Sequence, residues 1–125
     1  MSLIVLAAGP GITVQDLGRP GFLAQGLSRG GAADPVALAE GAALLGQDAG
    51  LAAIELAGAP ARFRLTAPAR IALTGAPFRA LLRDETGQTS LAWNASHTLP
   101  AAPSNGATHI SWKKSGKVTR LLDSA

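Results

Sequence analysis

The segment GPGITVQDLGRPGFLAQGLSRGGAAD, residues Gly9 to Asp34, decides the fold of this chain. Glycine recurs throughout the segment and two prolines interrupt it, so it cannot form an ordinary helix or a long regular strand. The pattern predicts a series of tight turns that bring the backbone and a few polar groups close to another part of the molecule or to a ligand. Glycine content alone does not distinguish these two outcomes.

Short elements flank and interrupt this segment. The apolar run from Leu3 to Ala7 predicts a buried strand, and residues Ile12 to Gln15 predict another short strand. The R-P-G sequence after Gly18 predicts a sharp turn, and residues 22–24 are expected to be extended. Residues 28–33 are expected to form a loop.

One helix is indicated directly after this loop. Asp34 can accept a hydrogen bond from a free backbone N–H at the helix start, Pro35 suits the first helical position, and Gly46 suits the end. At helical spacing Leu38 and Leu45 share a face with Ala42. Because the helix contains few polar residues, we expect it to be mostly covered.

Beyond the helix the sequence pattern has a period of two residues. Strands are predicted at residues 53–56, 62–66, 70–73, 78–83 and 90–93, with a hairpin loop at residues 84–87. Several short strands, frequent turns and one helix predict a mainly-β barrel or sandwich. After about Pro100 no clear core pattern remains, and residues 101–125 are predicted to form a divergent, irregular tail.

Composition narrows the class of protein. The chain has 125 residues, no cysteine and a net charge of +3, which fits one domain without disulfides or thiolate metal sites. Most arginines are spread along predicted strands and are not clustered with aromatic residues, so a nucleic-acid partner is not indicated. The apolar run near residue 1 lacks the basic n-region of a signal peptide, and the sequence contains no 18-residue apolar stretch. We therefore expect a cytoplasmic protein without a membrane span.

Three polar residues in the glycine-rich segment form the most informative group. Gln15 precedes Asp16, and Asp16 and Arg19 are three residues apart across a turn, so the carboxylate and the guanidinium can pair. Such a pair can position an amide or a urea-like substrate, or it can simply fasten the turn. The residues alone leave both roles open.

Four other features of the sequence have structural explanations. The sequence around Ser28 matches G-x-S-x-G, but three residues separate it from the helix cap, which favours a loop over a nucleophile elbow. A phosphate at the helix start would compete with Asp34, and no phosphate-loop sequence exists. Glu55 lies in an apolar strand and needs a partner, for which Arg19, Arg62 or Arg70 are available; a structural role is favoured. His97 and His109 show no metal-ligand spacing.

The run T-V-Q-D-x-G-R-x-G at Thr13 to Gly21, followed by GLSRGGAADPVAL at residues 26–38, resembles the biotin-dependent carboxyltransferase, or allophanate hydrolase subunit 2, family. The resemblance implies a cyclophilin-like β-barrel, of which residues 1–100 form the first part. It also implies an ATP-dependent 5-oxoprolinase, or a carboxyltransferase that moves a carboxyl group from carboxybiotin to urea. ATP or carboxybiotin would be used through a subunit 1 partner, and no motif of this chain binds either one.

The chemistry of the residues, taken together with the resemblance, gives individual residues expected roles. Asp16 and Arg19 are the expected catalytic residues, and the expected substrate-binding residues are Gln15, Ser28, Gly30 and Gly31. Structural roles are expected for Asp34 and Glu55, and no metal site is expected. Because family domains have two related halves, we expect a truncated member that is inactive alone. The alternatives are a non-catalytic regulatory subunit that binds the subunit 1 relative, or a degenerate fragment; a homo-oligomer is left open.

Overall fold

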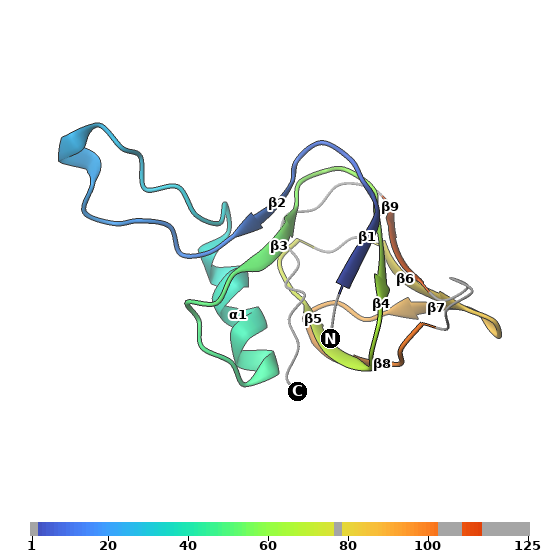
Figure 1. Ribbon diagram of the computed structural model, residues 1–125. Helices are drawn as coiled ribbons and strands as arrows, with labels where there is room; N and C mark the ends of the chain where they lie inside the picture. The colour runs from blue at the N-terminus through green and yellow to red at the C-terminus, as the bar shows by residue number, and fades with distance from the viewer. Residues whose placement is uncertain (1–2, 77–78, 103–108, 114–125) are drawn as a thin grey trace.

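The computed structural model of the protein describes residues 3–76, 79–102 and 109–113. Within these ranges the chain is mainly β, with one α-helix and one short 3-10 helix (Figure 1). Neighbouring strands all pair in the antiparallel direction. The predicted class, mainly β with one helix, is confirmed.

Three antiparallel sheets make up this β structure. The largest contains, in order of pairing, β1 (Leu3–Ala8), β4 (Ala61–Leu65), β9 (His109–Lys113), β6 (Arg79–Asp84) and β7 (Gly87–Leu91). The two smaller sheets pair β2 (Ile12–Gln15) with β3 (Ala53–Leu56), and β5 (Ala69–Leu73) with β8 (Ala95–Leu99). Because β1 and β7 end the largest sheet, the described strands do not close on one another, as expected for part of a β-barrel.

The hydrophobic core is shared by the three sheets. Strand β4 shows how the sequence builds it: Phe63 and Leu65 are buried, whereas Arg62 between Ala61 and Phe63 is exposed. This alternation follows from the two-residue period of a strand. Burying a phenylalanine contributes about 1.5–3 kcal/mol, so Phe63, which is fully buried, is a major contributor to the core.

Helix α1 (Pro35–Leu45) begins and ends where the sequence predicts. The Asp34 carboxylate accepts a hydrogen bond from the Ala37 N–H at 3.0 Å. At the other end, Gly46 has a φ of 67°, a left-handed conformation that glycine adopts without strain. These two caps satisfy backbone groups that have no partner inside the helix.

The two sides of α1 have different surroundings. Leu38, Ala42 and Leu45 are buried, as predicted, on the side that packs against β5 and β8. The Thr74 hydroxyl donates to the Ala37 carbonyl at 2.7 Å and joins the helix to the end of β5. The expectation that the helix is mostly covered is wrong, because within the described residues the opposite side, including Val36, has no neighbour to cover it.

Strand β9 corrects the expectation of an irregular tail. It pairs with β4 on one edge and β6 on the other, and Ile110 is buried in the core. The sequence pattern missed it because only one short strand follows a long non-periodic stretch; hydrogen bonds from both neighbours order it. Residues 103–108 and 114–125 lie outside the described residues, and the proposed domain division at residue 100 stays a prediction.

Two local expectations also need correction. Residues 22–24 are not extended, because Leu23–Gln25 forms the 3-10 helix η1, closed by a hydrogen bond from the Gly26 N–H to the Leu23 carbonyl at 3.0 Å. Strand β7 begins earlier than predicted, at Gly87 and not at Ser90, because the hairpin turn is shorter. Trp93 therefore follows the strand, where its indole N–H donates to the Gly75 carbonyl at 2.6 Å.

The β6–β7 turn explains the shorter hairpin loop. The Asp84 carboxylate accepts hydrogen bonds from the hydroxyl and backbone N–H of Thr86 and from the backbone N–H of Gly87. These donors, the Thr86 hydroxyl first, lower the pKa of Asp84 below its ordinary value. The carboxylate thus closes a turn of two residues between Asp84 and Gly87, which pair in register.

The place of β9 in the core can be tested by truncating its buried side chain. We expect Ile110→Ala to lower the free energy of unfolding by about 2–5 kcal/mol, because it leaves a cavity between the sheets. The exposed β8 residue Thr98 supplies the control variant Thr98→Ala, with an expected change of about 0.5 kcal/mol or less. Urea denaturation followed by tryptophan fluorescence measures both, and equal stabilities would place β9 outside the core.

Candidate functional site

Residues 16–33 form an arm that leaves β2 and returns to α1 (Figure 1). Two backbone hydrogen bonds join its two sides at the base: the Arg19 N–H donates to the Arg29 carbonyl, and the Ala32 N–H donates to the Asp16 carbonyl, both at 2.8 Å. In Figure 1 the arm extends away from the sheets and from the body of α1. The tight turns of the glycine-rich segment thus bring its outgoing and returning sides together.

Gly18 and Gly31 lie against each other where the two sides of the arm cross. A Cβ atom on Gly31 would lie 2.7 Å from the Gly18 nitrogen, and one on Gly18 would lie 2.6 Å from the Arg29 carbonyl oxygen. Both residues also have positive φ angles, 77° and 84°. Only glycine fits this crossing, because both the space and the backbone conformation exclude a side chain.

Glu55 fastens the returning side of the arm to β3. The side chain is buried, and its Oε2 accepts a hydrogen bond from the Ala33 N–H at 2.9 Å. The arginine partners considered from the sequence are wrong: the partner is a backbone amide, which satisfies a buried carboxylate without a second charge. The strand pairing of β3 with β2, which sets Glu55 opposite Thr13, brings the carboxylate to the base of the arm.

An open depression of about 380 Å³ lies at the base of the arm. Its walls combine residues from both sides of the crossing: Gln15, Asp16, Gly18, Arg19, Arg29, Gly30 and Gly31. A smaller hollow of about 130 Å³ shares part of this wall and continues toward Pro35. The structure therefore brings five of the six residues predicted for catalysis and substrate binding to one depression, all except Ser28.

Asp16 and Arg19 do not form the ion pair that their spacing allows; within the described residues each has a different partner. The Asp16 Oδ1 atom accepts a hydrogen bond from the Gly18 N–H at 2.7 Å, and the Arg19 Nε–H donates to the Ser28 carbonyl at 3.2 Å. Each side chain is therefore held by a backbone group and not by the other side chain. The carboxylate bonds to the amide two residues later in its own turn, whereas the guanidinium bonds to a carbonyl on the opposite side of the arm. Both charged groups are exposed beside the depression.

Gln15 and Ser28 occupy supporting positions. The Gln15 side-chain amide donates to the Thr13 hydroxyl at 3.1 Å, and the side chain is half-buried at the wall of the depression. Ser28 contributes its backbone carbonyl to Arg19, and its side chain does not line the depression. The G-x-S-x-G sequence does not form a nucleophile elbow, since a loop follows Ser28 and α1 begins only at Pro35.

Arg29 is the residue of this wall that sequence reasoning missed. It lines both hollows, it is exposed, and among the described residues its guanidinium makes no hydrogen bond. Its position beside two consecutive glycines, Gly30 and Gly31, was visible in the sequence. Nothing in the sequence showed that the returning chain would pair with Arg19 at this residue and place it in the same wall as Asp16.

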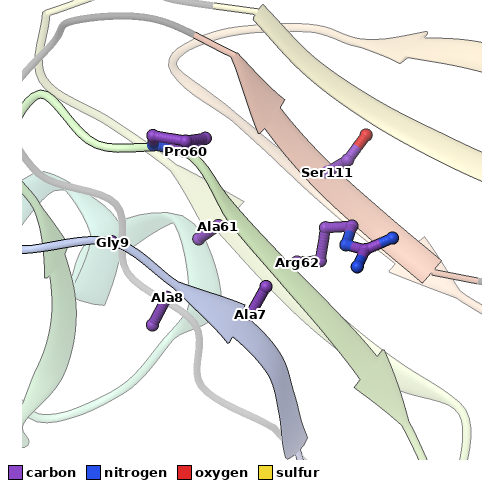
Figure 2. Close-up of a pocket in the computed structure, with 7 residues that line it drawn as sticks. All are labelled: Ala7, Ala8, Gly9, Pro60, Ala61, Arg62 and Ser111. Carbon is purple, nitrogen blue, oxygen red and sulfur yellow. The ribbon is translucent and has the colours of Figure 1, made fainter.

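Two further depressions lie elsewhere on the chain. One, of about 350 Å³, runs over β1, β4 and β9; Figure 2 shows the small side chains of Ala7, Ala8 and Ala61 along its floor, with Arg62 as its one charged residue. The other, of about 430 Å³, lies beside α1 and contains Glu40. Neither one gathers charged groups of both signs, so the depression at the base of the arm is the candidate site.

Two features are absent from the described part of the chain. None of its His, Asp and Glu side chains form a group of three or more that could hold a metal. No helix among the described residues has the length and apolar character needed to cross a bilayer.

Comparisons with known proteins identify the family. Residues 25–109 match the family model described as "Carboxyltransferase domain, subdomain A and B", and the chain belongs to this carboxyltransferase family. The solved structure of the urea amidolyase of K. lactis is similar, with a TM-score of 0.77 and 20% sequence identity. The match covers 92% of this chain and 7% of that one, so the chain spans a small part of the solved protein. No curated protein matches the chain at a significant level.

The crossing can be tested with a matched pair of glycine variants. Gly30 and Gly31 both have positive φ, but a Cβ on Gly30 meets no atom within 4 Å. We expect Gly30→Ala to cost about 1–2 kcal/mol through backbone strain alone, and Gly31→Ala to cost more because its Cβ meets backbone atoms of Gly18. Hydrogen exchange of the Ala32 N–H reports on the crossing. Equal exchange in the two variants would contradict the close approach.

Proposed function

We propose that the depression at the base of the arm binds a small cyclic amide or urea-like substrate, as part of a biotin-dependent carboxyltransferase or an ATP-dependent 5-oxoprolinase. The observation that carries this proposal is the meeting of Asp16, Arg19 and Arg29 around one open depression. Membership of the carboxyltransferase family supports the reaction class. The likeness to urea amidolyase supports the fold alone, because sequence identity is 20%.

The polar groups suit the two ends of such a substrate. Guanidinium N–H groups of Arg19 and Arg29 can donate to a carbonyl or carboxylate oxygen, and the second oxygen of Asp16, which carries no hydrogen bond to the described residues, can accept from an amide N–H. Gln15 offers both an amide donor and an acceptor. The bare backbone at Gly30 and Gly31 lets a flat ligand approach closely. Asp16 and Arg19 are therefore proposed to orient the reacting amide.

The activating group is proposed to come from a partner subunit of the subunit 1 type. ATP would supply a phosphoryl group that activates the amide, and carboxybiotin would supply a carboxyl group. The chain itself offers no phosphate site at the start of α1, because Asp34 accepts from the Ala37 N–H there. The two arginines that line the depression could bind either the carboxyl group of carboxybiotin or a phosphate group of ATP, so both donors remain part of the proposal.

A second candidate function is a non-catalytic subunit that binds and regulates the subunit 1 relative. It is favoured by the apolar side chains exposed at the end of the arm, among them Leu23, which is 79% exposed. The two candidates place different demands on the depression. A catalytic component must bind the small molecule, whereas a purely regulatory one needs only the arm.

Direct binding separates these candidates. We expect 5-oxoproline, and more weakly urea, to shift the backbone amide NMR signals of residues 15–19 and 29–31. Arg29→Ala is expected to weaken 5-oxoproline binding by roughly tenfold, the effect of losing one hydrogen bond to a charged group. Arg62→Ala removes an exposed arginine from β4 and is the matched control. Shifts confined to other parts of the chain would overturn the proposed site.

Dependence on a partner is a separate prediction. We expect the purified 125-residue chain to show no 5-oxoproline-dependent ATP hydrolysis and no carboxyl transfer to urea. Addition of a subunit 1-type protein is expected to produce one of these activities, and Asp16→Asn is expected to reduce it at least tenfold, with Asp48→Asn as a control outside the depression. Turnover by the chain alone would contradict the requirement for a partner.

A further inference from the structure

Two apolar surfaces lie uncovered among the described residues. The first, the arm tip, consists of Phe22, Leu23 and Leu27, which are 48%, 79% and 46% exposed. The second, the helix face, consists of the exposed Val36 and Ala43 and the half-buried Leu44, which lie around Glu40 on α1. Exposed apolar side chains that gather in a patch, as those of the arm tip do, mark interaction sites more often than isolated ones do.

The arm tip is held in a defined shape. The Gln25 and Leu27 N–H groups both donate to the Phe22 carbonyl, at 3.1 and 3.2 Å, and the Arg19 side chain ties the arm together below the tip by its bond to the Ser28 carbonyl. No residue of η1 is buried. A segment ordered by its own hydrogen bonds, yet with its apolar side chains exposed, is pre-organised for a partner because little entropy is lost on binding.

The helix face has a shape that receives such a tip. A depression of about 430 Å³ lies between α1 and the ends of neighbouring strands, lined by Glu40, Ala43, Leu44, Thr74 and Asn94. Val36, one turn before Glu40, is 65% exposed and extends the apolar surface along the helix. The depression has room for a leucine or a phenylalanine side chain.

Charge on the two surfaces is complementary. Glu40 is exposed and supplies the acidic group at the helix face. Arg19 and Arg29 are exposed on the arm below the tip, and Arg29 makes no hydrogen bond to the described residues. An apolar contact flanked by opposite charges favours one docking orientation over others.

We propose that two copies of this chain associate, each placing its arm tip on the helix face of the other. The arm does not reach its own helix face, because its base is fixed by Glu55 and the crossing and it extends away from α1 (Figure 1). A reciprocal exchange uses the same two surfaces twice and closes the assembly as a two-fold dimer. Three large apolar side chains per copy make a small interface, so a dissociation constant on the order of micromolar is expected. This association does not depend on the proposed function.

Sedimentation equilibrium of the full chain over roughly 1–300 μM tests the association, a range that brackets a micromolar constant. We expect a reversible monomer–dimer equilibrium that Leu23→Glu weakens at least tenfold. Val14 is exposed to a similar extent, 71%, but lies on β2 outside both surfaces, so Val14→Glu is the matched control and should leave the equilibrium unchanged. Glu40→Arg should also weaken association, and Arg29→Glu in the same chain should restore part of it.

Engineered cysteines test which surfaces meet. Because the chain has no cysteine, Leu23→Cys with Ala43→Cys is expected to give a disulfide-linked dimer on mild oxidation, whereas Val14→Cys with Ala43→Cys is not. A chain that stays monomeric throughout the concentration range overturns the proposal. So does a dimer that Leu23→Glu leaves intact, or equal crosslinking of the two cysteine pairs. If the arm tip binds only another protein, the chain stays monomeric at every concentration, and this result also overturns the proposal.

Discussion

The close approach of Gly18 to Gly31 is the constraint on which the arm and its depression depend. Two sides of one loop cross with no side chain between them, and the backbone hydrogen bonds of Arg19 and Ala32 lie on either side of the crossing. A Cβ at either glycine would meet backbone, which cannot move aside as a flexible side chain can. Because the two sides of the arm approach so closely, residues 15–19 and 29–31 line the same depression, although the rest of the arm separates them along the chain.

The crossing is in turn anchored to the sheets by one buried carboxylate. Glu55 reaches from β3 to the Ala33 N–H, immediately before the residue that caps α1. A buried acid without a partner is costly, so this bond couples the position of the arm to the pairing of β2 with β3. The helix, the arm and the β2–β3 sheet therefore form a connected unit beside the five-stranded sheet. This unit fixes the positions of the charged residues that line the depression.

Local signals in the sequence predicted most of the elements. The sequence predicted both ends of α1, at Asp34-Pro35 and at Gly46, and the alternation in β4. It also located the turn between β6 and β7, although not its length. These signals could be recognised because caps, strand period and turn residues act over a few positions. Strand β9 was not readable, since its order comes from β4 and β6 on its two edges. The exposed side of α1 was also missed: its composition resembles that of a buried helix, and only the arrangement of neighbours shows that one side is open.

For the candidate site, the sequence by itself determined which polar residues the outgoing side offers, Gln15, Asp16 and Arg19, and which turns require glycine. The tertiary structure decided what these side chains contact. It separated Asp16 from Arg19, gave Glu55 a backbone partner and not an arginine, and brought Arg29 into the wall. The physical reason is range: glycine conformations and caps follow from adjacent residues, whereas the partner of a charged side chain depends on which distant segment the folded backbone places beside it.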